Sequence, residues 1–237
     1  MNQIAIDAGN TRIKYGIFNE QKLLKADLVH ELPELAEIVI QYQVQHGIIS
    51  SVRSLEQVPL PGLGKIMWLT PAVPVPITNN YGTPQTLGMD RLAAVIGASF
   101  LFPGHDCLVI DAGTCITFDF INREATYYGG SISPGLDMKF KAVHTFTGKL
   151  PLVEQVEKDR VPLIGRNTTG CLQSGVLNGT LAEVEGMITE YKQQSPDLVT
   201  VVCGGDAPFF EKNVKAPIFV VPDLVLIGLN RILNYNV

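Results

Sequence analysis

The stretch 6-IDAGNTRIKYGIF-18 runs as a buried β-strand, turns at an Asp-Ala-Gly-Asn-Thr corner and continues as a second strand. A closely similar stretch returns as 110-IDAGTCITFDFI-121. The two aspartates, Asp7 and Asp111, are 111 − 7 = 104 residues apart. For one copy, an ordinary glycine turn with a capping aspartate explains the pattern as well as a binding site does. Two copies, each at the head of one half of the chain, instead indicate a duplicated unit whose corner has a function.

The hydrophobic periodicity predicts a similar order of elements in both halves. In the first half we expect strands at 3–8, 12–18, 22–29, 47–51 and 66–69, and helices at 33–46 and from residue 88 onward. In the second half we expect strands at 107–111, 116–121, 125–133, 199–203 and 218–221, helices after 134, at 168–193, from 205 and at 222–234, and a loop or lid at 154–165. Each half opens with three strands and then alternates helix with strand, which predicts two α/β domains, 1–106 and 107–237.

Composition limits the partners of the chain. It has 237 residues, of which 46% are hydrophobic, enough for a sizeable core. A net charge of −5 and a pI near 5.4 argue against a general nucleic-acid or membrane surface. The sequence lacks the apolar run of about 18 residues that a transmembrane helix needs, and an acid at position 7 does not fit a signal peptide. We therefore expect a cytoplasmic protein with no nucleic-acid and no membrane partner.

The cysteines and histidines do not indicate a zinc site. Cys107, Cys115, Cys171 and Cys203 form no Cys-x-x-Cys pair, and the four histidines are not at metal-ligand spacing. We interpret all four cysteines as plain core residues.

Corners of this kind can cradle phosphates, because backbone N–H groups and the hydroxyls of Thr11 and Thr114 can donate to phosphate oxygens. Each aspartate can hold a hydrated cation, and Mg²⁺ suits this arrangement because it keeps several waters and takes only one or two carboxylates. Two facing corners would grip a triphosphate such as ATP from both sides. Lys14, on the second strand, can add positive charge to the same phosphates.

Other nucleotide motifs are absent or weaker. The sequence contains no Walker A (G-x-x-x-x-G-K-[ST]) and no G-x-G-x-x-G pattern, which excludes P-loop and Rossmann sites. The segment 201-VVCGGDA-207 places two glycines between an expected strand and an expected helix. Adenine could lie against the backbone there, although a simple tight turn is an equal alternative.

Together, the corners and the glycine pair resemble the acetate and sugar kinase, Hsp70 and actin superfamily, whose duplicated ribonuclease-H-like domains enclose a nucleotide in an interdomain cleft. The middle of the chain narrows this resemblance through 79-NNYGTPQTLGMDRLAAVIGA-98, 129-GGSISPGL-136 and 164-IGRNTTGCLQSGVLNG-179. In this order, over nearly the whole chain, the motifs are similar to those of type III pantothenate kinases. The resemblance implies ATP-dependent phosphorylation of pantothenate to 4′-phosphopantothenate, the first step of coenzyme A synthesis.

The resemblance makes Asp90 the general base that accepts the pantothenate hydroxyl proton. From the residues alone, an Asp-Arg pair that only caps a helix is the alternative. Arg91 would hold the pantothenate carboxylate or support Asp90. The implied substrate pocket consists of Tyr81, Gly88, Met89, Asp90, Arg91 and Thr168, with Thr169 as an alternative to Thr168.

The family resemblance also implies how ATP and cations bind. ATP would contact Asp7, Ala8, Gly9, Asn10, Thr11, Arg12, Ile13, Lys14 and Thr114. Asp7 would hold Mg²⁺ through water, and Asp111 would ligate a monovalent cation, K⁺ or NH₄⁺. Substrate and cation sites at a dimer interface imply a homodimer, with 139-KFKAVHTFTGKLPLV-153 as a candidate contact or a core segment. Cys115 and Cys203 depart from the family pattern, and we expect altered packing there.

Two rival interpretations remain at this point. A kinase for another small alcohol or acid of the same superfamily would keep both corners and differ around 79–91. A non-catalytic nucleotide-binding regulator or chaperone-like ATPase would not transfer phosphate. The presence of Asp90 and Arg91 alongside both corners speaks against the second rival.

Overall fold

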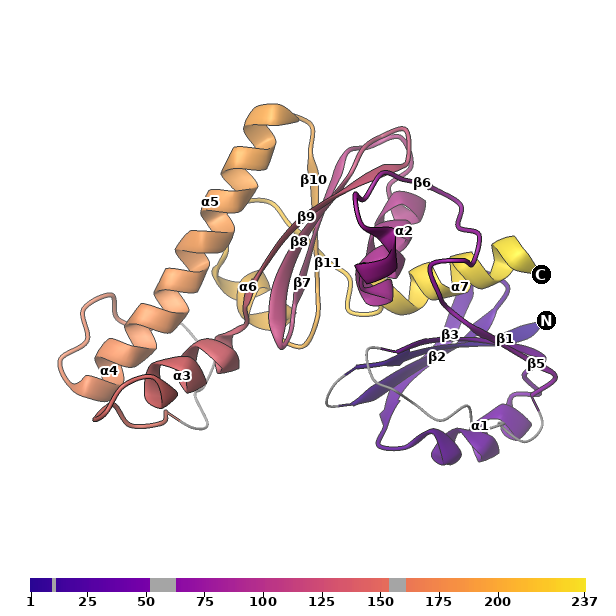
Figure 1. The fold of residues 1–237 in the computed structure, drawn as a ribbon, viewed down its shortest axis with the longest axis horizontal. Helices are drawn as coiled ribbons and strands as arrows, with labels where there is room; N and C mark the ends of the chain where they lie inside the picture. Colours follow the sequence, from indigo (N-terminus) through magenta and orange to yellow (C-terminus); the bar gives the residue numbers. More distant parts are fainter. Residues whose placement is uncertain (10–11, 52–62, 154–160) are drawn as a thin grey trace. The chain divides into compact units, whose positions relative to one another are not determined.

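The computed structural model describes residues 1–9, 12–51, 63–153 and 161–237 (Figure 1). The chain divides into two compact units. Unit 1 comprises Met1–Gly104, Ile121–Gly129 and Asp223–Val237, and unit 2 comprises His105–Phe120 and Gly130–Pro222. The predicted division into domains 1–106 and 107–237 follows the sequence repeat, and it stays a prediction. Within the described ranges, no helix is long and apolar enough to cross a membrane.

Unit 1 is built on a five-stranded sheet in the order β3-β2-β1-β4-β5. The strands are β1 (Asn2–Ala8), β2 (Ile13–Asn19), β3 (Lys22–Val29), β4 (His46–Ser51) and β5 (Lys65–Trp68). The first three pair antiparallel, and β4 and β5 join in parallel. The helical segments of this unit are η1 (Leu32–Glu34), α1 (Leu35–Gln41), η2 (Pro84–Thr86), α2 (Met89–Leu101) and α7 (Leu224–Asn236).

The central strand β1 is covered on both faces. Because side chains alternate across a strand, Ile4 and Ile6 share one face, where they pack with Leu35 and Val39 of α1. Helix α7 also contacts β1 and β4, and it packs along α2. The central position of β1 explains why Ile4, Ala5, Ile6 and Ala8 are apolar and fully buried.

Helices α2 and α7 approach closely because each has a glycine at their crossing. A Cβ atom built on Gly228 would lie 1.8 Å from Ala93 O, and one built on Gly97 would lie 2.5 Å from Leu224 O. These separations are far shorter than van der Waals contact, so a side chain at either position would force the helices apart. The two glycines therefore fix the start of α7 against α2.

Unit 2 contains most of a six-stranded sheet in the order β11-β10-β7-β8-β9-β6. The strands are β6 (Thr78–Asn79), β7 (Cys107–Ala112), β8 (Cys115–Ile121), β9 (Thr126–Pro134), β10 (Val199–Cys203) and β11 (Phe219–Val220). Strand β6 belongs to unit 1 and pairs in parallel with Thr126 and Tyr127 of β9, which also lie in unit 1. The helical segments are α3 (Leu136–Thr145), α4 (Thr168–Gln173), η3 (Ser174–Asn178), α5 (Gly179–Gln194) and α6 (Ala207–Asn213).

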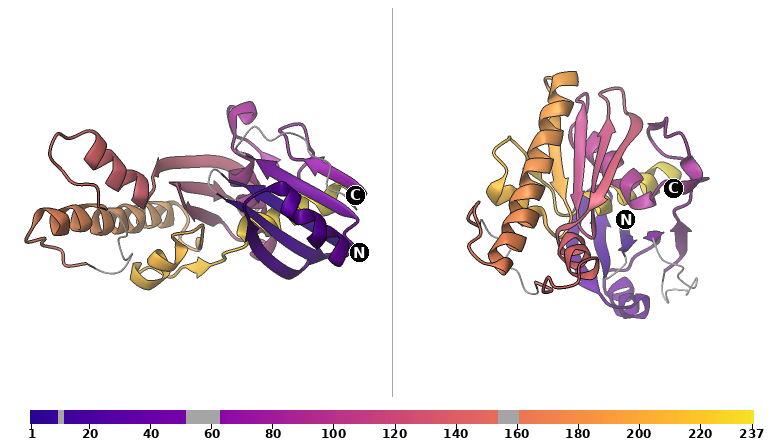
Figure 2. Two further views of the ribbon diagram at one scale, coloured as in Figure 1. Left: turned by 90° about the horizontal axis from the view of Figure 1, so that it is seen from below. Right: turned by 60° about the vertical axis from the view of Figure 1, so that its left-hand side comes forward.

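The core of unit 2 lies between its strands and helices. Leu108 and Ile110 of β7 share one buried cluster with Phe140 of α3 and with Val184 and Ile188 of α5. Figure 2 shows α3 beside the first part of the long helical run formed by α4, η3 and α5. The sequence predicted one helix over 168–193, and this run confirms it, with η3 as a π-helical segment inside it.

The predicted helix at 33–46 is too long by several residues. Helix α1 ends at Gln41, because Gln43 takes a left-handed backbone conformation with φ 49°. The N–H of Val44 then bonds to Val39 O and that of Gln43 to Ile40 O, which is the Schellman arrangement of a helix C-terminus. Glycine usually occupies this position after a helix. Because glutamine occupies it here, the sequence did not indicate where the helix ends. The two-residue strand β6 was also missed, because it is too short to show a period.

Candidate active site

The first corner is the turn between β1 and β2. The strand register places Asp7 opposite Lys14, so both stand on the same face of neighbouring strands. Lys14 Nζ lies 3.0 Å from Asp223 Oδ1, and Asp223 is the residue at which α7 begins. The lysine predicted to bind phosphate thus contacts an acidic residue that no sequence motif indicated.

The other residues of this corner vary in burial. Ala8 and Ile13 form the last strand pair before the turn and are buried. Gly9 is half-buried and Arg12 is exposed. Asn10 and Thr11 lie outside the described residues, so their predicted contacts with ATP stay predictions.

The second corner lies between β7 and β8, and Gly204 comes close to it. Gly204 has φ +90°, and a Cβ atom built on it would lie 2.3 Å from Ala112 O and 2.4 Å from Asp111 Oδ1. The backbone just after Gly204 also binds this corner, since Asp206 N donates a hydrogen bond to Ala112 O at 2.9 Å. Gly204, the first glycine after β10, is therefore required for the close approach of this turn to the Asp111 carboxylate.

A further glycine encloses the same corner from the start of α3. Gly135 N donates to Thr114 O at 3.0 Å, and a Cβ atom on Gly135 would lie 2.1 Å from Gly113 O. Thr114 itself is exposed, and Asp111 is half-buried. Two chain segments, before α3 and after β10, thus meet the predicted phosphate corner, and the sequence repeat alone did not indicate this.

The predicted substrate motif opens helix α2. Gly88 is the N-cap residue, and Asp90 lies in the first turn. Asp90 Oδ1 accepts a hydrogen bond from Arg91 N at 2.8 Å, and a Cβ atom on Gly88 would lie 2.4 Å from this same oxygen. Asp90 is half-buried, while Met89 and Arg91 are buried. The glycine therefore leaves the space that the Asp90 carboxylate occupies.

Arg91 is only 8% exposed and is held by aromatic rings. Its Cζ lies 5.7 Å from the ring centroid of Tyr81, a cation–π distance. Tyr81 in turn stacks on the fully buried Tyr127, with centroids 6.1 Å apart and an interplanar angle of 11°. Gly129 has φ +98°, and a Cβ atom there would lie 2.8 Å from Tyr81 Cδ2. The sequence motifs include Tyr81, Arg91 and Gly129 but not Tyr127, and they do not indicate that Tyr127 and Gly129 pack against Tyr81.

The threonine of the Arg-Asn-Thr-Thr-Gly segment stands at the start of α4 in unit 2. Asn167 caps this helix, because its Oδ1 accepts a hydrogen bond from Gly170 N at 2.7 Å. Thr168 and Thr169 are both exposed, so exposure does not separate the two candidates. A pocket of about 700 Å³ lies at the start of α4 and is lined by residues 161–167, Gly170 and Gln173.

Three of the four cysteines agree with a core role to different degrees. Cys107 and Cys203 are buried, and burial, helped by the neighbouring Asp106, raises the pKa of the Cys107 thiol to about 12. Cys115 is half-buried. For Cys171 the prediction is wrong: it is exposed, because it lies in α4, none of whose residues is buried. Among the described residues, no group of three or more His, Cys, Asp or Glu could hold a metal ion.

The arrangement of these elements is the actin-like ATPase and sugar kinase fold, as the sequence predicted. A glucokinase from an Antarctic psychrotroph matches with a TM-score of 0.54 and 13% identity, over 99% of each chain. A chain from Campylobacter jejuni, named as a conserved Baf family transcriptional activator, matches with a TM-score of 0.62 and 22% identity, over 98% of each chain. At these identities the likeness shows the fold alone.

Sequence comparison identifies the family within this fold. Residues 3–190 match the family described as type III pantothenate kinase. A type III pantothenate kinase from Phocaeicola vulgatus is 45% identical over 100% of this chain and 99% of its own. One from Cytophaga hutchinsonii is 46% identical over 99% of both chains. The chain belongs to the type III pantothenate kinase family, which confirms the resemblance that its motifs indicated.

Proposed function

We propose that this chain transfers the γ-phosphoryl group of ATP to the hydroxyl of pantothenate, forming 4′-phosphopantothenate and ADP. The observation that carries the proposal is family membership along the whole chain. The half-buried Asp90 in the first turn of α2, beside the buried Arg91, supplies the chemistry that such a transfer needs. Phosphoryl transfer depends mainly on positioning and on electrostatic stabilisation of the phosphates.

In this reaction the hydroxyl oxygen of pantothenate forms a bond to the γ-phosphorus. The bond between that phosphorus and the β–γ bridging oxygen breaks, and ADP leaves. The hydroxyl proton passes to the Asp90 carboxylate. Because Arg91 N already donates to Oδ1, Oδ2 is the oxygen that would receive the proton. Asp90 lies in the first turn of α2, where the helix dipole presents its positive end.

The substrate carboxylate would meet the Arg91 guanidinium, which lies over the Tyr81 ring, and Tyr81 in turn stacks on Tyr127. A fixed planar guanidinium can donate two parallel hydrogen bonds to a carboxylate. Gly88 and Met89 complete this side of the pocket. We assign Thr168 as a further substrate contact, with Thr169 as the alternative, on the family motif rather than on exposure.

ATP would bind with its phosphates at the corners that carry Lys14 and Thr114. Asp7 would hold Mg²⁺ through water, and the ion would neutralise phosphate charge. Asp7 lies near the end of β1, opposite Lys14 of β2, and a single carboxylate suits Mg²⁺, which takes few protein carboxylates when phosphates and water supply the rest. The adenosine would lie near the Gly204–Gly205 turn.

A monovalent cation, K⁺ or NH₄⁺, would sit at Asp111. Asp111 is half-buried in β7 (Cys107–Ala112), and Gly204 packs directly against its carboxylate. Oxygen ligands of this kind suit a large monovalent cation.

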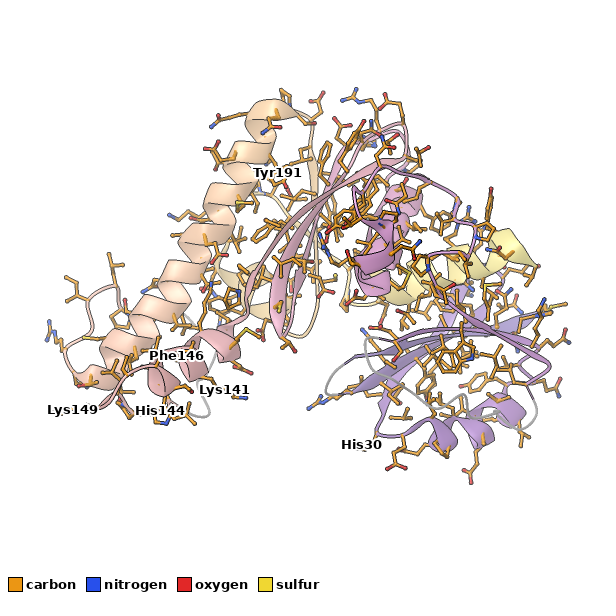
Figure 3. The ribbon with its side chains drawn as sticks, viewed as in Figure 1. His30, Lys141, His144, Phe146, Lys149 and Tyr191 are labelled. Atoms are coloured by element: carbon orange, nitrogen blue, oxygen red, sulfur yellow. The ribbon has the colours of Figure 1, made fainter. Side chains whose placement is uncertain are left out.

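We also propose a homodimer that works in the cytoplasm, where ATP is available. Figure 3 labels Phe146, which is the C-cap residue of α3. Phe146 is 86% exposed, and Leu163 and Ile164 are each 79% exposed. Large apolar side chains this exposed are typical of contact surfaces. Phe146 supports the part of 139–153 after α3 as a candidate contact, while Leu163 and Ile164 lie outside that segment.

The test is a coupled assay of ADP release with purified protein, ATP, Mg²⁺ and pantothenate, together with identification of the phosphorylated product. Turnover with pantothenate and not with a panel of other small hydroxy acids supports the proposal. Faster turnover with another alcohol would support the first rival. Binding of ATP without transfer to any acceptor would support a regulator. A sizing column run at the assay concentration tests the dimer.

A further inference from the structure

We propose that Asp223 is a positioning residue for nucleotide binding. Its carboxylate holds the Lys14 ammonium at the first corner, so that this side chain is already ordered when ATP binds. The inference rests on the proposed function of that corner, and it assigns a role to a residue outside every motif considered above.

The contact itself is direct. Lys14 Nζ lies 3.0 Å from Asp223 Oδ1, with the two side chains 32% and 27% exposed. Pairs this exposed contribute little to stability, because solvent screens them and two long side chains lose freedom. A pair of this kind is better explained by the orientation it imposes than by the folding energy it supplies.

The local sequence would give Asp223 a different role. It occupies the N-cap position of α7, where aspartate usually accepts a hydrogen bond from a backbone N–H of the first turn. Its side chain makes no such bond to the described residues of α7. The carboxylate contacts Lys14 across a sequence separation of 223 − 14 = 209 residues instead.

The start of α7 is a rigid support for this carboxylate. Leu224, the next residue, is fully buried. Its carbonyl oxygen approaches Gly97 of α2 so closely that a Cβ atom there would lie 2.5 Å away. The backbone beside Asp223 is therefore fixed by the α2–α7 crossing.

Lys14, in contrast, has a long stem with four rotatable bonds, and ordering such a side chain during binding lowers affinity. A fixed carboxylate removes part of that cost before the nucleotide arrives. The ammonium has three N–H donors, so one can stay on Asp223 while others reach phosphate oxygens. Contact with Asp223 and contact with phosphate are thus compatible.

The experiment is a double-mutant cycle on the full chain, with Asp223→Asn, Lys14→Met and the double variant. We measure KM for ATP·Mg²⁺ and for pantothenate, and the ATP·Mg²⁺ dissociation constant by calorimetry. We expect Asp223→Asn to weaken ATP·Mg²⁺ binding about 10-fold, the size of one lost hydrogen bond to a charged group, with KM for pantothenate unchanged. In the Lys14→Met background the same substitution should have no further effect, because its partner is gone.

Two comparisons separate positioning from a structural role. Asp27→Asn breaks another Lys–Asp pair of unit 1, in which Lys25 Nζ lies 3.5 Å from Asp27 Oδ2, and it should leave ATP binding unchanged. Asp223→Glu restores a carboxylate and should recover part of the affinity, even if the asparagine variant folds poorly. Equal losses from Asp223→Asn in the wild-type and Lys14→Met backgrounds would overturn the proposal, as would tighter ATP binding in Asp223→Asn. If wild type binds ATP·Mg²⁺ but does not phosphorylate pantothenate, the proposed function fails while the calorimetric cycle still decides the role of Asp223.

Discussion

Replacing Gly204 by alanine should damage the second corner, because the methyl group has no place to go. The new Cβ would lie 2.3 Å from Ala112 O and 2.4 Å from Asp111 Oδ1, and the backbone at this position has φ +90°. The Ala112 carbonyl oxygen belongs to the backbone and cannot yield as a side-chain end would, so the turn or the hairpin must move.

The expected cost follows from two contributions. A non-glycine residue in a sparsely populated backbone region costs about 1–3 kcal/mol, and forcing a methyl group into a filled space costs about 1–3 kcal/mol. Together these predict a loss of about 2–6 kcal/mol at the melting temperature. For a chain of this size, that corresponds to a Tm lower by about 4–24 °C. Since Asp111 must shift, activation by K⁺ should fall as well.

Gly205 is the matched control, because a Cβ atom on it meets no described atom within 4 Å and its φ is not in the left-handed range. Thermal unfolding and steady-state rates in KCl and in NaCl would be measured for wild type, Gly204→Ala and Gly205→Ala. We expect Gly205→Ala to change stability by no more than about 0.5 kcal/mol, as surface substitutions usually do. If Gly204→Ala has the same melting temperature as Gly205→Ala and is still activated by K⁺, the reasoning about this corner is refuted.

Three further expectations concern the chemistry. Asp90→Asn should lower kcat by about 10²–10⁴-fold, the usual contribution of a general base, while calorimetry still shows ATP binding; a wild-type rate would make Asp90 a helix-capping residue only. Replacing NaCl by KCl or NH₄Cl at constant ionic strength should raise the rate, since simple screening treats these salts alike; equal rates in all three would remove the monovalent cation from Asp111. Tyr127→Leu should raise KM for pantothenate, because Tyr81 loses its stacking partner and Arg91 lies over Tyr81. The control Tyr128→Leu changes a side chain that is 53% exposed and should leave KM unchanged. Equal KM values for the two variants, measured well below both melting temperatures, would show that the stack plays no part in binding.

The fold could be predicted because its signals are local and repeated. Alternating apolar residues in β1 and β2 and the second Asp-Ala-Gly corner at β7 lie within short windows, where the period of two is visible. The end of α1 could not be placed, because Gln43 adopts a conformation that usually belongs to glycine. Strand β6 has two residues and depends for its existence on pairing with β9.

The candidate site divides in the same way. Asp7, Asp90 and Asp111 belong to short sequence motifs in which an acidic residue indicates a function, so they could be proposed from the sequence. Tyr127 and Gly129 carry no chemistry of their own. They matter only because β6 brings Tyr81 against β9, and such a pairing leaves no pattern in either segment.

Asp223 shows why the local sequence can suggest a role that a side chain does not have. An aspartate directly before an apolar helix is a standard N-cap, and nothing in the neighbouring residues argues otherwise. The structure shows that its carboxylate lies on Lys14 instead. A cap that is available and unused implies that the side chain is held by something distant, here by a lysine 209 residues earlier in the chain (223 − 14 = 209). The α2–α7 crossing supports this contact, because Gly97 and Gly228 let the two helices lie close together and so hold the backbone beside Asp223. If Asp223 positions Lys14 as proposed, glycines in the interiors of two helices contribute to the phosphate corner without touching it.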